Sequence, residues 1–288
     1  MKNRIEGKLS VEAEPQRLFR ALTTAQELTQ WFCEYAEVAL AERRYDFWGR
    51  FTPGEPDQGR GRHPLLVLEP NRRLRFAWQL GEAETLVEVH LQAQDAGTLV
   101  TLSHEGVRAH ETGEANLADF WALSLENLRA WVERGVTGPR CDFSVTPAGD
   151  VQLNIDIAAP QAAVYAALIR PHELERYIAT RATVEPHPGG RYDFGWEKGG
   201  PVKILEVEPG KRLSYSWTYG DQPETVVSWT LEDSGGGTRL TLVHSGFTQD
   251  RKSRDYKTGW LKYLNRLKNL VEVGSRWQQA VLQVTDLS

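Results

Sequence analysis

The 288-residue chain is long enough for two domains of ordinary size, and its 40% hydrophobic and 25% charged residues are typical of a globular protein. This composition excludes a disordered or fibrous chain. The net charge of -5 lacks the basic excess of proteins that grip a phosphate backbone, so no nucleic-acid partner is predicted.

The cysteines and the N-terminal segment indicate the cellular environment. Cys33 and Cys141 lie far apart and have no metal-ligand spacing, so we expect neither a disulfide framework nor a zinc site. Residues 1–9 carry scattered charges instead of the apolar core of a secretion signal, and no apolar run is long enough to span a membrane. We therefore expect a soluble protein in a reducing cytoplasm, with no membrane span.

The chain begins with the pattern of an amphipathic strand followed by two short helices. In residues 5–13 apolar and polar residues alternate, which predicts a strand with one buried face. Pro15 suits the first turn of a helix, and a second short helix is expected to end at Trp31 and Phe32. The same succession begins again at residue 151, in the second half of the chain.

The first half carries an insertion before its central strands. The offset between equivalent residues falls from 147 at Tyr45 and Tyr192 to 139 at Pro70, so eight extra residues lie within residues 51–61. This stretch is rich in proline and glycine, which is typical of an enlarged hairpin loop. We interpret it as a surface insertion, with a functional lid as the alternative.

A strand motif follows that the chain contains twice. The pattern E-P-x-[RK]-R-L-x-[FY]-x-W-x-x-G occupies residues 69–81 and returns at residues 208–220, at a constant offset of 139. In the first copy Leu74, Phe76 and Trp78 alternate with polar or small residues, which is the period of a half-buried strand. The simplest interpretation is a duplicated domain.

Two further strands and a long helix close each half. The expected strands are residues 85–93 and 98–105 in the first half, and 225–232 and 238–245 in the second. The three glycines at residues 235–237 join two strands, so they predict a hairpin turn rather than a phosphate loop. Apolar residues at helical spacing then predict long helices over residues 117–132 and 256–271.

The division between the halves is expected at the linker of residues 137–139. The predicted domains are residues 1–137 and 138–288, and the second includes a tail from residue 275 that has no counterpart in the first half. We assign this tail to packing or dimer contacts.

The last strand of each half carries a second motif, T-x-x-T-L-x-H-x-G, whose histidines are His104 and His244. Together with the element order, the two motifs resemble the SRPBCC (START-like) superfamily, and within it the branch named after the C-terminal domain of the activator of heat-shock protein 90 ATPase. The resemblance covers nearly the whole chain as two copies, of which the second is the closer match. It implies an α+β protein of two tandem helix-grip domains. In each, a curved antiparallel sheet wraps around a long C-terminal helix, with two short helices after the first strand.

Inward-facing aromatic residues and histidines form the candidate ligand site. Burial alone would explain them, because each buried aromatic side chain contributes about 1.5–3 kcal/mol. The number of tryptophans favours a ligand cavity instead, since buried ring N–H groups need partners. A solid core and a cavity of roughly a few hundred Å³ both remain open. The candidates are Trp31, Phe47, Trp78, His104 and Trp121 in the first half, and Tyr177, Phe194, Trp217, Trp229, His244 and Trp260 in the second.

The two inward histidines each need a hydroxyl, a carbonyl or a ligand as partner. A satisfied core histidine is the simpler interpretation, and catalysis is the alternative. The inward positions offer few carboxylates that recur in both halves, so we predict no catalytic pair. The seven histidines, including His110, show no metal-ligand spacing, so neither a metal nor a cofactor is predicted. His90 and the basic residues Arg60, Arg62, Arg72, Arg73 and Arg75 are interpreted as solvated surface groups.

Superfamily members include lipid carriers, plant hormone receptors, polyketide cyclases and co-chaperones, so the fold does not choose the function. From the inward aromatics we predict a non-catalytic binding protein for small apolar ligands. One alternative is a stress-response co-chaperone that binds a chaperone. Stimulation of an ATPase is not expected, because the chain lacks the N-N-W-H-W segment of the eukaryotic activator's N-terminal domain. The other alternative is a cyclase or hydrolase that uses an inward histidine.

Overall fold

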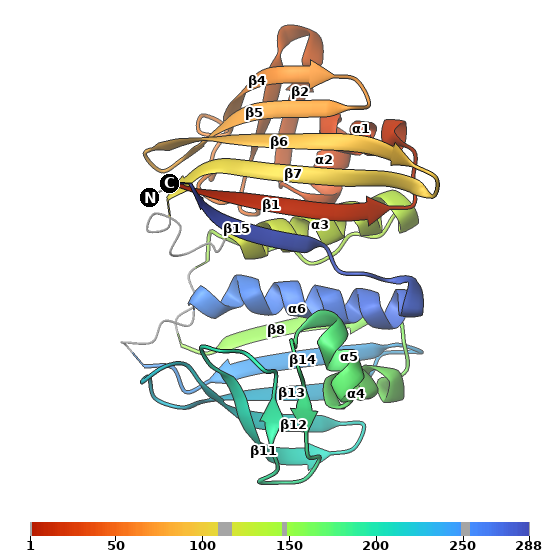
Figure 1. Ribbon diagram of the computed structural model, residues 1–288, viewed down its shortest axis with the longest axis vertical. Helices are drawn as coiled ribbons and strands as arrows, with labels where there is room; N and C mark the ends of the chain where they lie inside the picture. Colours follow the sequence, from red (N-terminus) through yellow and green to blue (C-terminus); the bar gives the residue numbers. More distant parts are fainter. Residues whose placement is uncertain (1, 109–116, 146–148, 249–253, 288) are drawn as a thin grey trace. The chain divides into compact units, whose positions relative to one another are not determined.

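The computed structural model describes residues 2–108, 117–145, 149–248 and 254–287, and its chain divides into two compact units (Figure 1). The first unit comprises Met1–Thr146 together with Ala280–Ser288, and the second comprises Pro147–Gln279. The division therefore falls nine residues after the expected boundary at residue 137, and the end of the tail belongs to the first unit instead of the second.

The first unit is an eight-stranded antiparallel sheet with helices against it. The strand order is β15-β1-β7-β6-β5-β4-β3-β2. The strands are β1 (Lys2–Val11), β2 (Tyr35–Ala39), β3 (Arg44–Trp48), β4 (Arg62–Glu69), β5 (Arg73–Leu80), β6 (Ala83–Gln94), β7 (Gly97–Arg108) and β15 (Val281–Leu287). The helices are α1 (Pro15–Thr23), α2 (Ala25–Trp31), the short 3-10 helix η1 (Leu40–Glu42) and the long helix α3 (Leu117–Arg134).

The second unit repeats this plan on a smaller sheet. Five antiparallel strands follow the order β11-β12-β13-β14-β8, and a separate two-stranded sheet is formed by β10 and β9. The strands are β8 (Val151–Ile157), β9 (Thr183–Val184), β10 (Tyr192–Asp193), β11 (Gly200–Glu208), β12 (Arg212–Thr218), β13 (Thr225–Asp233) and β14 (Thr238–Ser245). The helices are α4 (Gln161–Ile169), α5 (Pro171–Tyr177), the long helix α6 (Arg254–Val273) and the 3-10 helix η2 (Gly274–Arg276).

Each core lies between the sheet and the long helix. Along β6 and β13 buried residues alternate with more exposed ones, as the period of a strand requires. In α3, Trp121, Leu125 and Leu128 are buried at helical spacing and belong to the same hydrophobic cluster as the strands. The predicted α+β class and the two helix-grip domains are therefore confirmed.

The repeated motif forms β5 and β12, and the turn before each strand explains part of its sequence. Asn71 and Gly210 stand at equivalent positions in these turns and adopt positive φ angles of 61° and 78°. Glycine and asparagine are the residues that tolerate this left-handed conformation best.

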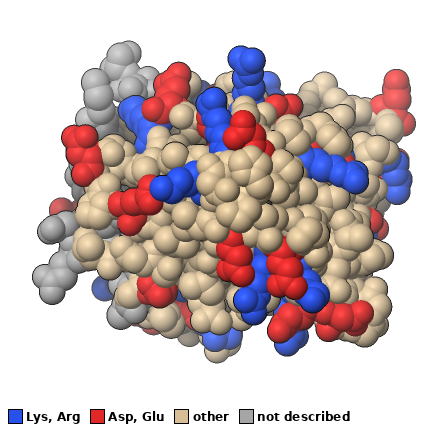
Figure 2. All heavy atoms as spheres, turned by 90° about the horizontal axis from the view of Figure 1, so that it is seen from below, with Lys and Arg blue, Asp and Glu red and all other residues tan. Residues whose placement is uncertain are grey.

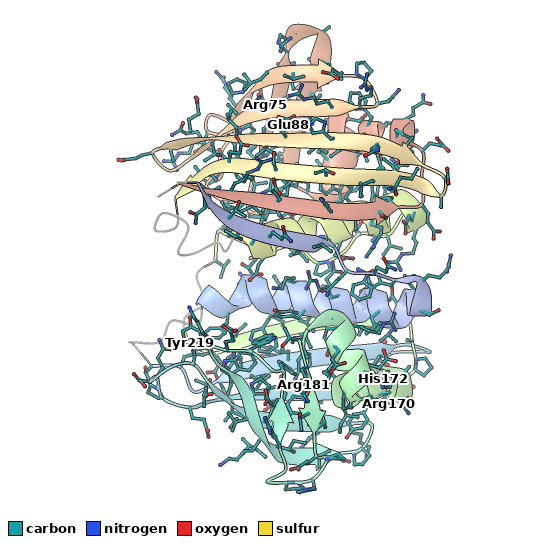
Figure 3. All side chains as sticks on the ribbon, viewed as in Figure 1. Arg75, Glu88, Arg170, His172, Arg181 and Tyr219 are labelled. Atoms are coloured by element: carbon teal, nitrogen blue, oxygen red, sulfur yellow. The ribbon has the colours of Figure 1, made fainter. Side chains whose placement is uncertain are left out.

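On the outer face of the first sheet, the Arg73 guanidinium donates to the Glu88 carboxylate at 2.7 Å, and Arg75 lies beside the same carboxylate (Figure 3). Two of the arginines interpreted as solvated surface groups, Arg73 and Arg75, are therefore paired with Glu88.

The tail adds a strand to the first sheet. β15 runs antiparallel to β1, from Lys8 opposite Val281 to Lys2 opposite Leu287. At the start of this strand the Ala280 N–H donates to the buried Glu126 carboxylate at 2.8 Å. The tail thus packs within the chain, in the first unit.

Candidate functional site

The interior of the first unit contains a hydrogen-bonded chain centred on His104. The Thr85 hydroxyl donates to the Trp78 carbonyl at 2.7 Å, so its oxygen is left to accept from His104 Nε2, which lies at 2.8 Å. The other ring nitrogen, Nδ1, accepts from the Trp121 indole N–H at 3.0 Å. This arrangement fixes the neutral imidazole with its proton on Nε2.

The second unit repeats the chain with equivalent residues. Thr225 lies 3.3 Å from the Trp217 carbonyl and 2.9 Å from His244 Nε2, and Trp260 donates its indole N–H to His244 Nδ1 at 3.0 Å. Both histidines are fully buried. The two inward histidines therefore have protein partners at both ring nitrogens.

Burial decides the charge of His104. It lowers the pKa of this imidazole to about 3, so the ring is neutral at neutral pH. A neutral ring that already donates at one nitrogen and accepts at the other cannot take a proton unless the Trp121 contact breaks. The geometry suits a structural bridge between sheet and helix better than proton transfer.

The inserted loop of the first unit places a carboxyl group in the interior. Glu55 is 1% exposed, and its Oε1 accepts the Trp78 indole N–H at 3.0 Å. Among the described residues its second oxygen, Oε2, has no hydrogen-bond partner. Burial raises the pKa of Glu55 to about 8, so the group is mainly a neutral carboxylic acid at neutral pH.

This loop is anchored on both of its sides. The Gly49 N–H donates to the Glu55 carbonyl at 2.6 Å, and the Phe143 N–H donates to the Arg50 carbonyl at 2.7 Å. The Arg140 guanidinium lies 4.0 Å from the centre of the Phe51 ring. The stretch interpreted as a surface insertion therefore contributes a buried side chain to the core.

The second unit has the same tryptophan without this acceptor. Trp217 occupies the position of Trp78 and is 5% exposed, but among the described residues its indole nitrogen has no hydrogen-bond partner. The connection from β10 to β11 spans residues 194–199 and holds no counterpart of the inserted loop. The two equivalent indole N–H groups thus differ in their hydrogen bonding.

A small cavity remains inside the first unit. Its volume of about 20 Å³ matches a single water molecule and is far below the roughly 300 Å³ or more of a typical ligand pocket. The void lies between the sheet and the helices. It is lined by Leu22, Trp31, Phe32, Tyr45, Leu74, Phe76, Val89, Val100, Leu102, Trp121, Leu125 and Leu128.

All eleven predicted site residues are buried, and they separate into two groups that belong to the two cores. Trp31 and Trp121 line the cavity of the first unit, whereas Phe47, Trp78 and His104 do not. Several of the ring N–H groups have acceptors in the protein: Trp31 donates to the Ala21 carbonyl at 3.0 Å, and Trp229 to the Tyr215 hydroxyl at 3.0 Å.

Sequence reasoning missed Glu55 and His63. His63 is stacked on Phe47, and burial lowers the pKa of this histidine to about 4. The alternation of buried and exposed residues along β4 could have indicated that His63 faces inward. Glu55 stands in a stretch without periodicity, where no sequence signal indicates its direction. His110 lies outside the described residues.

The outer surface carries charged side chains of both signs on the face shown in Figure 2. Figure 2 presents one face on which acidic and basic side chains are interspersed around a central uncharged area. Arg170, His172 and Arg181 are exposed side chains near α4 and α5, and His172 pairs with Glu173 at 3.3 Å (Figure 3). Within the described residues, no group of three or more histidine, cysteine or acidic side chains could hold a metal, and no helix has the length and apolar character to cross a bilayer.

The sheets, the long helices and the paired interior chains define a protein of two helix-grip domains. The family model described as "Activator of Hsp90 ATPase homolog 1-like protein" matches residues 12–133 and again residues 158–272. Because these segments make up most of the sequence, the chain belongs to this family. A search of curated proteins finds no match.

Solved structures similar to the chain include single-copy and longer proteins. The Mesorhizobium loti protein MLL2253 is 27% identical over 44% of this chain and 98% of its own, with a TM-score of 0.40. The Aha1 dimer from Colwellia psychrerythraea is 23% identical over 44% and 99%, with a TM-score of 0.41. DynU16, a protein of the dynemicin biosynthetic locus, is 17% identical over 95% and 99%, with a TM-score of 0.37.

Proposed function

We propose that the protein is a non-catalytic binding protein for small apolar ligands, which it holds between the sheet and the long helix of a helix-grip unit. The observation that carries this proposal is the state of the interior histidines. In both units the imidazole bridges a threonine and a tryptophan, so the group an acid-base enzyme would use serves as a structural link. Around it the interior is aromatic and aliphatic, which suits apolar ligands.

The small void in the first unit sets a condition on binding. A ligand larger than one or two atoms would fit into this cavity of about 20 Å³ only if it displaced the lining side chains. Ligand binding would therefore be accompanied by a change in the environment of the interior tryptophans.

A ligand screen tests the proposal. The full chain, stripped of bound lipid by an organic-phase wash and refolding, would be titrated with fatty acids and with two- and three-ring aromatic compounds. We expect at least one class to change the tryptophan emission and to appear as a one-to-one complex in native mass spectrometry. If neither class binds at high micromolar concentration, the proposal is wrong.

Membership in the activator family favours a second candidate, a co-chaperone that binds the cell's own Hsp90-type chaperone. Both family matches fall on helix-grip copies, and the chain lacks the N-N-W-H-W segment, so we expect binding without strong ATPase stimulation. Co-purification of the full chain with that chaperone tests binding, and an ATPase assay tests stimulation. Failure to co-purify from stressed cells would exclude this candidate.

The enzyme alternative depends on His104 or His244. Replacement of either residue by glutamine would leave turnover of a screened ligand unchanged if the histidines are structural. A loss of turnover in a variant that remains folded by circular dichroism would instead favour the enzyme.

A further inference from the structure

The second unit contains a buried hydrogen-bond donor that the described protein leaves unused. Trp217 Nε1 is buried and has no partner among the described residues, and the residue as a whole is 5% exposed. A buried donor without an acceptor costs about 1–3 kcal/mol, so an acceptor that reached it would be bound favourably. The first unit satisfies the equivalent donor, Trp78 Nε1, with the Glu55 carboxyl group.

The surroundings of Trp217 indicate how an acceptor could arrive. The rings of Trp196 and Tyr256 lie 5.6 Å and 6.4 Å from the Trp217 ring, and both side chains are only partly buried. Tyr219, two residues further along the chain, is 48% exposed beside the end of β12 (Figure 3). Trp196 and Tyr256 are thus partly exposed rings next to Trp217, and a molecule that displaced one of them would contact the Trp217 ring.

The corresponding part of the first unit is closed. Glu55 is held there by its loop, and Phe120, whose ring lies 6.0 Å from Trp78, is buried and in contact with Phe143. The inserted loop thus supplies the acceptor, and Phe120 and Phe143 supply the cover.

We propose that the second unit binds an apolar ligand whose neutral hydrogen-bond acceptor is taken by Trp217 Nε1, and that in the first unit the Glu55 side chain occupies the equivalent position as a permanent internal substitute. This inference rests on the proposed function and names the unit and the ligand chemistry. A neutral acceptor such as a ketone or ester carbonyl fits because aromatic rings surround the donor. A carboxylate would lose its hydration there without gaining a full charge partner from these rings.

Two probes of equal shape test the acceptor. The full chain would be titrated by calorimetry with 2-acetonaphthone, which carries a ketone oxygen, and with 2-isopropenylnaphthalene, in which a methylene group replaces that oxygen. We expect the ketone to bind about tenfold more tightly, since the hydrogen bond is made to an otherwise unpaired donor. Trp217→Phe keeps an aromatic ring but removes the N–H group, so it should abolish the preference while both probes still bind.

Trp277→Phe is the matched control. It makes the same change in the same unit. Tyr256, whose ring lies 6.4 Å from Trp217, is near the start of α6, whereas Trp277 follows the C-terminal end of that helix. We expect the tenfold preference to survive in this variant. Should Trp217→Phe fail to fold, indole N–H spectra of the wild-type chain decide: one signal should move downfield with the ketone and stay in place with the alkene.

The outcomes separate the two proposals. If neither probe binds, both the proposed function for this ligand class and the present inference are wrong. If both probes bind with equal affinity, if the preference survives in Trp217→Phe, or if no indole signal moves downfield, ligand binding stands and the role of Trp217 is overturned.

Discussion

The two units place the same tryptophan at the same point of the same strand, yet they treat its N–H group differently. Trp78 donates to Glu55, whereas Trp217 has no acceptor among the described residues. The interior histidine chain, by contrast, is the same in both units to within about 0.1 Å at the histidine. The difference therefore comes from a loop of eight extra residues and not from the duplicated core.

Two copies of one fold can therefore keep the same interior hydrogen bonds and still differ in a loop that contacts the core. The bridge through His104 or His244 joins sheet to helix, so its loss would weaken either unit. The indole N–H groups of Trp78 and Trp217 take no part in that bridge. An insertion can therefore add a side chain beside one of them without altering the strands.

The largest expected effect tests whether the bridge is equivalent in the two units. Trp121→Ala and Trp260→Ala each remove a large buried side chain and the donor to a histidine, so we expect each to destabilise its own unit by about 4 kcal/mol. Hydrogen exchange read by mass spectrometry reports each unit separately. Unequal losses would break the equivalence, and the corresponding phenylalanine variants, which keep most of the packing, should lose less.

Removal of Glu55 should affect only the first unit. Glu55→Ala leaves Trp78 Nε1 without its acceptor and opens space beneath the loop, so we expect a loss of about 2 kcal/mol. Glu55→Gln keeps a carbonyl oxygen for the indole and serves as the control, with little change at neutral pH. If the alanine variant is as stable as the wild type, the carboxyl group is not part of the core.

The raised pKa of Glu55 predicts a pH dependence confined to the first unit. The Glu55 carboxyl has a pKa of about 8 in the folded state and near 4.5 in the unfolded state, so the folded state holds the proton more tightly. Its contribution to the unfolding free energy is therefore complete below pH 4.5 and is lost as pH rises towards 8. His63 and His104 act oppositely, because their lowered pKa values make stability rise with pH up to about 6.5. Between about pH 6.5 and 8 the Glu55 contribution therefore dominates among these three groups.

Over that window we expect the first unit to lose about 1–2 kcal/mol of unfolding free energy. Denaturant unfolding at several pH values, followed by hydrogen exchange, measures the loss. The slope should disappear in Glu55→Gln, and a wild-type slope that persists there would show that another group titrates.

The smallest effect concerns the tail. Truncation after Gln279 removes β15, in which Val281 and Val284 are more than half exposed, and frees the Glu126 carboxylate from the Ala280 N–H. We expect a loss of about 1 kcal/mol in the first unit and none in the second, as measured by hydrogen exchange in β1. A loss located in the second unit would contradict the assignment of the tail.

The sequence predicted the parts of the fold that follow a local period. The alternation around Trp78 and its return at Trp217 indicated equivalent strands, and the same alternation placed His104 and His244 inward. The inward direction predicted that each histidine is buried. The cost of a buried imidazole without a hydrogen bond then predicted a partner for each.

Two features depended on contacts between segments distant in the sequence. The direction of Glu55 is set by a loop tied to Arg140 and Phe143, roughly ninety residues away, and no periodic pattern marks it. The strand at Val281 pairs with β1 at the opposite end of the chain, so its local pattern could indicate a strand but not its partner.

The position of β15 also has a consequence for biosynthesis. During translation, at about 5–20 residues per second, residues 147–279 must be made after the first unit's main segment before its last strand emerges. For on the order of ten seconds β1 therefore presents unpaired backbone groups to its surroundings on a nascent polypeptide. During that interval this edge of β1 can pair with a strand of another chain.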